Sequence, residues 1–200
     1  MSIAAIIREH IMQTRQGEPF TNTRFLKLGS RAAVDKTLSR LVKEGFIQRI
    51  VRGVFMRPKK NRFVGNVMPD AFRVAEVMAK DHGETIQVHG AEAARRFKLS
   101  TQVPTTPIFY TSGPTRNLRI GNLSVHQQHV SNRKLLLAGK PSGLALAALW
   151  YLGKDHVNAE VVRAIRAGLA EDELETLENT DIPAWMARAL KQDGKGTIGA

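Results

Sequence analysis

Apolar positions in the first part of the chain follow helical spacing at three places before changing to strand spacing. The first helix is predicted to start after the N-cap Ser2 and to end near Gly17. A short second helix is predicted between the N-cap Thr21 and Leu28, and a longer third helix after the N-cap Ser30. Their inward faces consist of aliphatic and aromatic residues: Ile3, Ile6, Ile7, Ile11, Phe25, Leu28, Val34, Leu38, Leu41 and Val42.

A β-hairpin is predicted directly after the third helix. Residues 46–50 and 54–56 are rich in β-branched and aromatic side chains, and Val51-Arg52-Gly53 between them has turn character. A short helix, a turn, a longer helix and a hairpin follow one another in this order in the winged helix-turn-helix. We therefore predict such a domain over residues 1–62.

A second domain with a mixed pattern is predicted over residues 67–190. Its helices are expected at 70–81, 90–97, 141–152, 157–169 and 182–190, and its strands at 85–88, 107–111, 117–120 and 123–127. Residues 191–200 are polar and glycine-rich, which predicts a flexible tail. The predicted fold class is α+β: a winged helix-turn-helix followed by a mixed α/β domain with a small sheet and several helices.

Positive charge is concentrated in the first domain. The chain carries 30 Lys+Arg and 18 Asp+Glu, a net charge of +12. Residues 1–62 hold 14 basic and 4 acidic side chains, so the remaining 16 and 14 leave the rest of the chain near neutral. This distribution favours an anionic partner at the first domain, with nucleic acid preferred over a membrane surface.

The outer face of the third helix and the hairpin carry the candidate DNA contacts. Arg31, Lys36 and Asp35 are assigned to base edges, and other side chains mainly to phosphates. The full predicted set is Thr21, Arg24, Ser30, Arg31, Asp35, Lys36, Ser39, Arg40, Arg49, Arg52, Arg57 and Lys59. The alternative is that these charges form an ordinary solvated helix face and, at residues 58–62, an ordinary connector.

Patterns typical of catalysis or metal binding are weak. His126 and His129 are three residues apart on a predicted strand, so they should point to opposite faces. Residues 139–143 lack the spacing of a phosphate-binding loop, and the acidic stretch 171–178 is typical of a solvated face or of a surface for a basic partner. We expect no metal site, no cofactor and no enzymatic activity.

Two stretches resemble a known family. Residues 38–50 (Leu-Ser-Arg-Leu-Val-Lys-Glu-Gly-Phe-Ile-Gln-Arg-Ile) with 52–55 (Arg-Gly-Val-Phe) resemble the winged helix of AbiEi-type antitoxins. Residues 89–94 (His-Gly-Ala-Glu-Ala-Ala), 99–104 (Leu-Ser-Thr-Gln-Val-Pro) and 109–113 (Phe-Tyr-Thr-Ser-Gly) are similar to the pattern that follows the wing in these families. By matching position, the resemblance implies DNA contacts from Arg31, Lys36, Arg40, Arg49 and Arg52.

The resemblance implies the antitoxin of a type IV toxin–antitoxin system. Such a protein binds inverted repeats in its own promoter, represses the operon, and counteracts a nucleotidyltransferase toxin without forming a stable complex with it. The alternatives are a stand-alone winged-helix regulator whose second domain senses a ligand or binds a protein, and a nucleic-acid enzyme that uses the winged helix for targeting. With no cysteine, no signal peptide and no apolar run of membrane-spanning length, the expected location is the cytoplasm.

Overall fold

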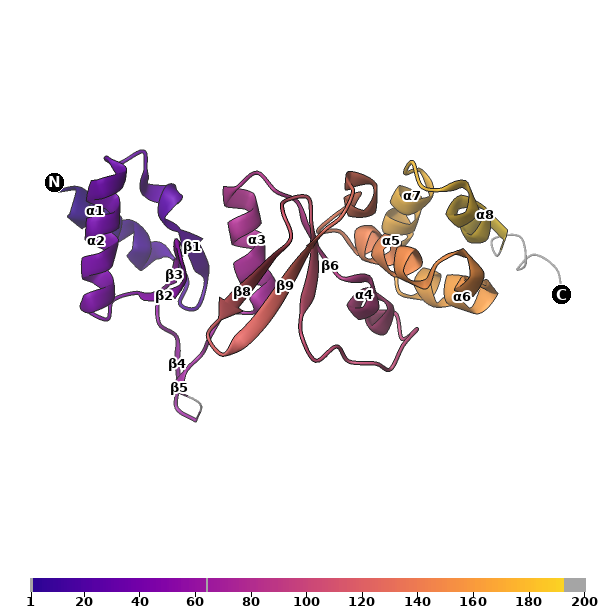
Figure 1. Cartoon of the computed structure of the whole chain (residues 1–200), viewed down its shortest axis with the longest axis horizontal. Coiled ribbons are helices and arrows are strands. Elements are labelled where there is room, and N and C mark those ends of the chain that lie inside the picture. The colour runs from indigo at the N-terminus through magenta and orange to yellow at the C-terminus, as the bar shows by residue number, and fades with distance from the viewer. Residues whose placement is uncertain (1, 64, 193–200) are drawn as a thin grey trace. The chain divides into compact units, whose positions relative to one another are not determined.

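The computed structural model describes residues 2–63 and 65–192, which fall into two compact units. The first unit comprises Met1–Glu84 and Asn117–Val125, and the second comprises Thr85–Arg116 and His126–Ala200. Helices and small sheets together make up the chain (Figure 1), so the fold is mixed α/β and consistent with the predicted α+β class.

The first unit is built on a three-stranded antiparallel sheet of order β1-β3-β2. Its elements are α1 (Ile3–Gln13), β1 (Pro19–Thr21), the 3₁₀ turn η1 (Asn22–Phe25), α2 (Arg31–Lys43), β2 (Gln48–Val51), β3 (Val54–Met56), β4 (Lys60–Asn61), β5 (Gly65–Asn66) and α3 (Ala71–Asp81). The strands β4 and β5 form a separate two-stranded ribbon (Figure 1).

Serine caps start the two main helices of this unit as predicted. The Ser2 hydroxyl accepts the Ala5 amide at 3.2 Å, and the Ser30 hydroxyl accepts the Ala33 amide at 3.3 Å. The apolar stripes of these helices meet the sheet in one core: Ile7, Ile11, Phe20, Phe25, Val34, Leu38, Leu41, Ile47 and Phe55. The sequence pattern predicted the core positions of α2 and, in α1, those of Ile7 and Ile11; Ile3, also predicted to face inward, is exposed, and Ile6 lies outside the core cluster.

The predicted second helix is shorter than expected. Only Asn22–Phe25 turns, as a 3₁₀ helix, and the Thr21 side chain does not cap it. The hydroxyls of Thr21 and Thr23 instead bond the carboxylate of Asp81 at the end of α3. A contact 60 residues away in sequence therefore decides the conformation of this segment.

Helix α3 belongs to the first unit, whereas the sequence placed it after the predicted boundary at residues 62–67. The Asp70 side chain caps it through the Phe72 and Arg73 amides, and the Arg73 guanidinium lies 2.7 Å from Glu18 beside β1. The first unit therefore continues to Glu84.

The second unit contains five α-helices of the described part of the chain, the strands β6 and β7, and the second half of β9. These strands belong to a four-stranded sheet of order β6-β7-β9-β8, of which Asn117–Ile120 of β8 and the start of β9 are assigned to the first unit. Strand β6 pairs antiparallel with β7, and β7 pairs parallel with β9. The strands are β6 (Ile86–Val88), β7 (Ile108–Thr111), β8 (Arg116–Ile120) and β9 (Leu123–His129), near their predicted positions. Gly121, between β8 and β9, has φ at +60°.

The helical elements of this unit are α4 (Gly90–Arg96), η2 (Asn132–Leu135), α5 (Pro141–Leu152), η3 (Lys154–His156), α6 (Ala159–Ala167), α7 (Glu171–Glu178) and α8 (Ala184–Gln192). The acidic stretch is itself the helix α7, and α8 extends through the first two residues of the predicted tail. Residues 193–200 of that tail lie outside the described residues.

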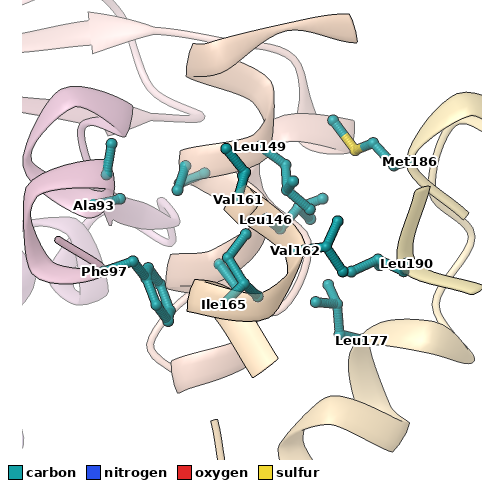
Figure 2. Close-up of a cluster of buried hydrophobic side chains, with 14 of the residues drawn as sticks. Ala93, Phe97, Leu146, Leu149, Val161, Val162, Ile165, Leu177, Met186 and Leu190 are labelled. Carbon is teal, nitrogen blue, oxygen red and sulfur yellow. The ribbon is translucent and has the colours of Figure 1, made fainter. Parts of the chain in front are cut away.

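The apolar core of the second unit surrounds α5 (Figure 2). Leu146 and Leu149 of α5 face Val162 and Ile165 of α6, and side chains from α4, α7 and α8 complete the cluster. The prediction that residues 141–152 form a buried helix is confirmed, because seven of its residues are buried. No helix in the described part of the chain combines the length and the apolar character needed to cross a bilayer.

Substitution Gly90→Ala should lower the free energy of unfolding by about 1–3 kcal/mol, because an overpacked contact forces the backbone to shift. A Cβ at this position would lie 2.3 Å from the Tyr151 Cβ and 2.7 Å from the Ala147 carbonyl oxygen on α5. Urea denaturation followed by circular dichroism measures the effect. Gly29→Ala is the control, because its Cβ would meet only the flexible end of Ile3; equal losses in the two variants would contradict the packing argument.

Candidate nucleic-acid interface

The outer face of α2 is polar, basic and exposed. Val34, Leu38 and Leu41 are buried on the inner face, which leaves the opposite face to solvent. A shallow hollow of about 330 Å³ lies on this outer surface, lined by Lys36, Thr37, Ser39, Arg40 and Lys43. Because no acidic side chain lines it, this part of the helix offers a cationic surface to an anion.

The ion pairs on this face are weak and open to water. The Arg31 Nε atom is 3.8 Å from the Asp35 carboxylate, with the two side chains 70% and 49% exposed. The Arg40 Nε atom is 3.6 Å from Glu44, again at the surface. Exposed pairs of this kind contribute about 0–1 kcal/mol, so both guanidinium groups can exchange their partner for a phosphate or a base edge.

The β2–β3 hairpin adds two exposed guanidinium groups. Arg52 lies in its turn, next to Gly53 at φ +80°, and Arg49 lies over the ring of Phe55 at 5.4 Å. The ring supports the Arg49 side chain without neutralising its charge. The hairpin therefore carries positive charge both at its tip and along β2.

Buried Asn22 links the hairpin turn to α2. Its side-chain amide donates to the Asp35 carboxylate at 2.9 Å, and its backbone amide donates to the Gly53 carbonyl at 3.1 Å. Asn22 is only 8% exposed, whereas the side chain of its partner Asp35 is 49% exposed, so the amide–carboxylate bond is partly buried. Asn22 thus fixes the position of Arg52 relative to the helix face. The sequence interpretation missed it, because a polar residue in a short turn gives no signal of a contact this distant.

Asp35 has a structural role on this face. It was assigned to base edges, but its carboxylate accepts the Asn22 amide and faces Arg31. Ser30 is occupied as the helix cap, whereas Lys36 and Ser39 have exposed side chains. Lys36 forms no ion pair with any residue that the structure describes.

Three predicted contacts are used within the first unit. The Arg57 guanidinium donates to the carbonyls of Met12 and Thr14, at 2.6 and 2.9 Å, where α1 ends. Arg24 donates to the Thr14 hydroxyl at 3.0 Å. The Thr21 hydroxyl faces the Asp81 carboxylate, which would repel a phosphate. We therefore leave these three residues out of the candidate interface.

Lys59 remains exposed, but its stem is placed by packing. An added Cβ on Gly17 would lie 3.2 Å from the Lys59 Cδ atom, so the aliphatic part lies against that glycine. The candidate interface in the structure thus consists of Arg31, Lys36, Ser39, Arg40, Lys43, Arg49 and Arg52, with Lys59 beyond the end of β3.

Histidines in the second unit have packing roles. The His89 Nδ1 atom accepts the Ala91 amide at 3.1 Å and caps α4, and its ring lies 4.7 Å from that of Tyr110. Burial lowers the pKa of His89, which favours the neutral ring that this cap requires. His126 and His129 lie on the same strand, β9. Among residues 2–63 and 65–192, no three His, Asp or Glu side chains gather as metal ligands.

Comparison with known proteins gives a family without a known function. A family model described as "Family of unknown function (DUF6088)" matches residues 6–177, so the chain belongs to this family. No curated protein matches it. Among solved structures, the Rv2827c protein from Mycobacterium tuberculosis is similar with a TM-score of 0.41 and 15% identity, over 96% of this chain and 78% of that chain.

Substitution Asn22→Ala should lower the free energy of unfolding by about 1–3 kcal/mol, because it removes a partly buried hydrogen bond from an amide to a carboxylate, between α2 and the segment before it. Urea denaturation measures the loss. Asn132→Ala is the matched control, because Asn132 is exposed. If the two variants lost the same stability, Asn22 would not be the link described here.

Proposed function

We propose that this member of the DUF6088 family binds double-stranded DNA through a winged helix-turn-helix and represses its own promoter. The observation that supports this proposal is the fixed pairing of a basic helix face with an arginine-tipped hairpin through Asn22. In this proposal α2 is the recognition helix, η1 and the following turn replace the first helix of the motif, and β2–β3 is the wing.

The dimensions and charge of α2 support this assignment. The major groove of B-DNA is about 12 Å wide and admits one α-helix, whose exposed side chains then reach base edges. Arg31 lies in the first turn of α2 and Lys36 one turn further, both exposed and without a buried partner. We assign Arg31 and Lys36 to bases, and Arg40 and Lys43 to the backbone beyond them.

The wing and the adjoining segment would supply contacts that depend little on sequence. Arg52 is assigned to a phosphate or to the minor groove next to the site of α2, and Arg49 and Lys59 to phosphates. Such contacts provide much of the affinity and most of its salt dependence.

The resemblance to AbiEi-type antitoxins extends the proposal to a type IV toxin–antitoxin system. In this role the winged helix would repress the operon, and the second unit would contribute to counteracting a nucleotidyltransferase toxin without a stable complex. A nucleotidyltransferase gene next to this one would support the extension. Survival of cells expressing that toxin only when this protein is present tests it directly.

A second candidate, a stand-alone regulator with a ligand-sensing domain, is favoured by one observation. The second unit contains an open cavity of about 560 Å³, whose lining includes the apolar side chains of Phe97 and Leu144 and the basic side chains of Arg96 and Lys98. A cavity of this size can hold a small molecule. A compound that stabilises the protein against heat and weakens its binding to DNA would support this candidate.

The experiment for DNA binding compares the region upstream of the gene with a scrambled duplex by fluorescence anisotropy at 50 and 200 mM salt. Preferential binding that weakens steeply with salt supports operator recognition. Equal, weak binding to both duplexes would contradict it.

Substitution Arg52→Ala should weaken binding to specific and scrambled DNA alike and should reduce the slope of log K against log salt by about 1, because it removes one phosphate contact. Arg163→Ala is the matched control, because it removes an exposed arginine from α6 of the second unit. A slope unchanged by Arg52→Ala would remove the hairpin tip from the interface.

Substitution Arg31→Ala should instead weaken specific binding by about 1–3 kcal/mol while leaving scrambled DNA nearly unaffected, as expected for an arginine that bonds a guanine edge. Competition between the two duplexes measures the ratio. An equal loss on both would show that Arg31 contacts only the backbone.

A further inference from the structure

The β4–β5 ribbon lies in a basic segment and carries an exposed aromatic ring. Residues 57–69 contain four basic residues and no acidic one. They form a two-stranded antiparallel ribbon in which Lys60 pairs with Asn66 and Asn61 with Gly65. Its tip carries Phe63, whose side chain lies outside every apolar core and is 84% exposed. A single exposed apolar side chain is common in proteins, so the candidate for a binding role is the combination of this ring with the basic residues around it.

The base of the ribbon is held by hydrogen bonds within the first unit. Arg57 holds the chain to the end of α1, and the Gly17 amide donates to the Arg57 carbonyl at 2.9 Å. The Val67 amide donates to the Lys59 carbonyl at 2.8 Å, which closes the ribbon. At the tip, the Asn61 side chain accepts the Phe63 amide at 2.8 Å and shapes the turn. The ribbon is thus an anchored arm and not a loose connector.

The tip combines an apolar ring with positive charge. The Arg62 guanidinium lies 5.3 Å from the centre of the Phe63 ring, and Lys60 is exposed on the strand that leads to it. An interface core between proteins is depleted of charged residues, and a single aromatic ring is too small an apolar surface to hold a bilayer. Cations around an apolar wedge are instead the means by which proteins enter the minor groove and open a base step.

The position of the ribbon separates it from the wing. Strand β3 runs from Val54, next to the β2–β3 turn, to Met56, and the ribbon begins beyond that far end. The wing turn and the ribbon therefore leave opposite ends of the three-stranded sheet. The ribbon is thus a candidate contact point separate from the wing, at the other end of the sheet.

We propose that the β4–β5 ribbon is a second DNA-binding arm, which enters the minor groove beyond the site of α2 and inserts Phe63 between two base pairs. This inference rests on the proposed DNA binding and deepens it. Lys60 and Arg62 contact the flanking phosphates, and the ring of Phe63 takes the place of the stacking that the opened base step loses. The arm lengthens the bound DNA and bends it away from the wedge.

The test uses the full-length protein and a set of duplexes from the region upstream of its gene. Each duplex carries 2-aminopurine at a different single position, so that the set scans the region. The wild-type protein should raise 2-aminopurine fluorescence at one step outside the segment contacted by α2. Phe63→Ser should abolish this rise and weaken binding about tenfold, because base–aromatic stacking is lost. Phe63→Leu keeps an apolar wedge and should keep the rise. Val103→Ser, which removes another highly exposed apolar side chain, should behave like the wild type.

Different outcomes would refute the β4–β5 arm alone or the proposed DNA binding as well. A wild-type protein that binds no duplex refutes both. A wild-type protein that binds with no fluorescence rise at any position, or a Phe63→Ser variant with an unchanged rise, refutes the arm and leaves the α2 interface standing. The arm is also refuted if Phe63→Ser leaves DNA binding unchanged but alters the oligomeric mass measured by sedimentation or the binding of the protein to anionic vesicles.

Discussion

The buried side chain of Asn22 is the constraint on which the proposed interface depends. It bonds α2 through Asp35 and the hairpin turn through Gly53, so one residue fixes the two cationic surfaces relative to each other. A long, flexible arginine gains specificity only when the backbone that carries it is positioned beforehand. Without this link α2 and the hairpin would still be basic, but apolar packing would have to set their spacing.

The positive charge of the first unit serves two different purposes. Arg57 and Arg24 donate to groups at the end of α1, and Arg73 pairs with Glu18, so these guanidinium groups stabilise the unit itself. The groups on α2 and on the β2–β3 hairpin have only weak or aromatic neighbours and remain available to a ligand. The net charge alone therefore overstates how many cations are available to a ligand, and the candidate interface is restricted to those with weak or aromatic neighbours.

Local signals in the sequence were enough to predict the helices that begin with a serine cap and the β2–β3 hairpin. Ser2 and Ser30 act on amides three residues away, and Gly53 permits the turn in which it lies. Contacts between distant segments could not be predicted in this way. The short η1 turn, the attachment of α3 to β1, and the internal use of Arg57 each depend on partners far along the chain. Asn22 belongs to the same class, which is why it was absent from the residues predicted from the sequence.

The most direct test of the account is to map the DNA-binding surface by NMR. Amide resonances of the full-length protein would be followed during titration with a duplex from its upstream region. We expect changes in amide chemical shift concentrated in α2 and the β2–β3 turn, with the resonances of the α5 core of the second unit unchanged. Shifts confined to the second unit, or spread evenly over both units, would contradict the assignment of α2 as the helix that contacts DNA.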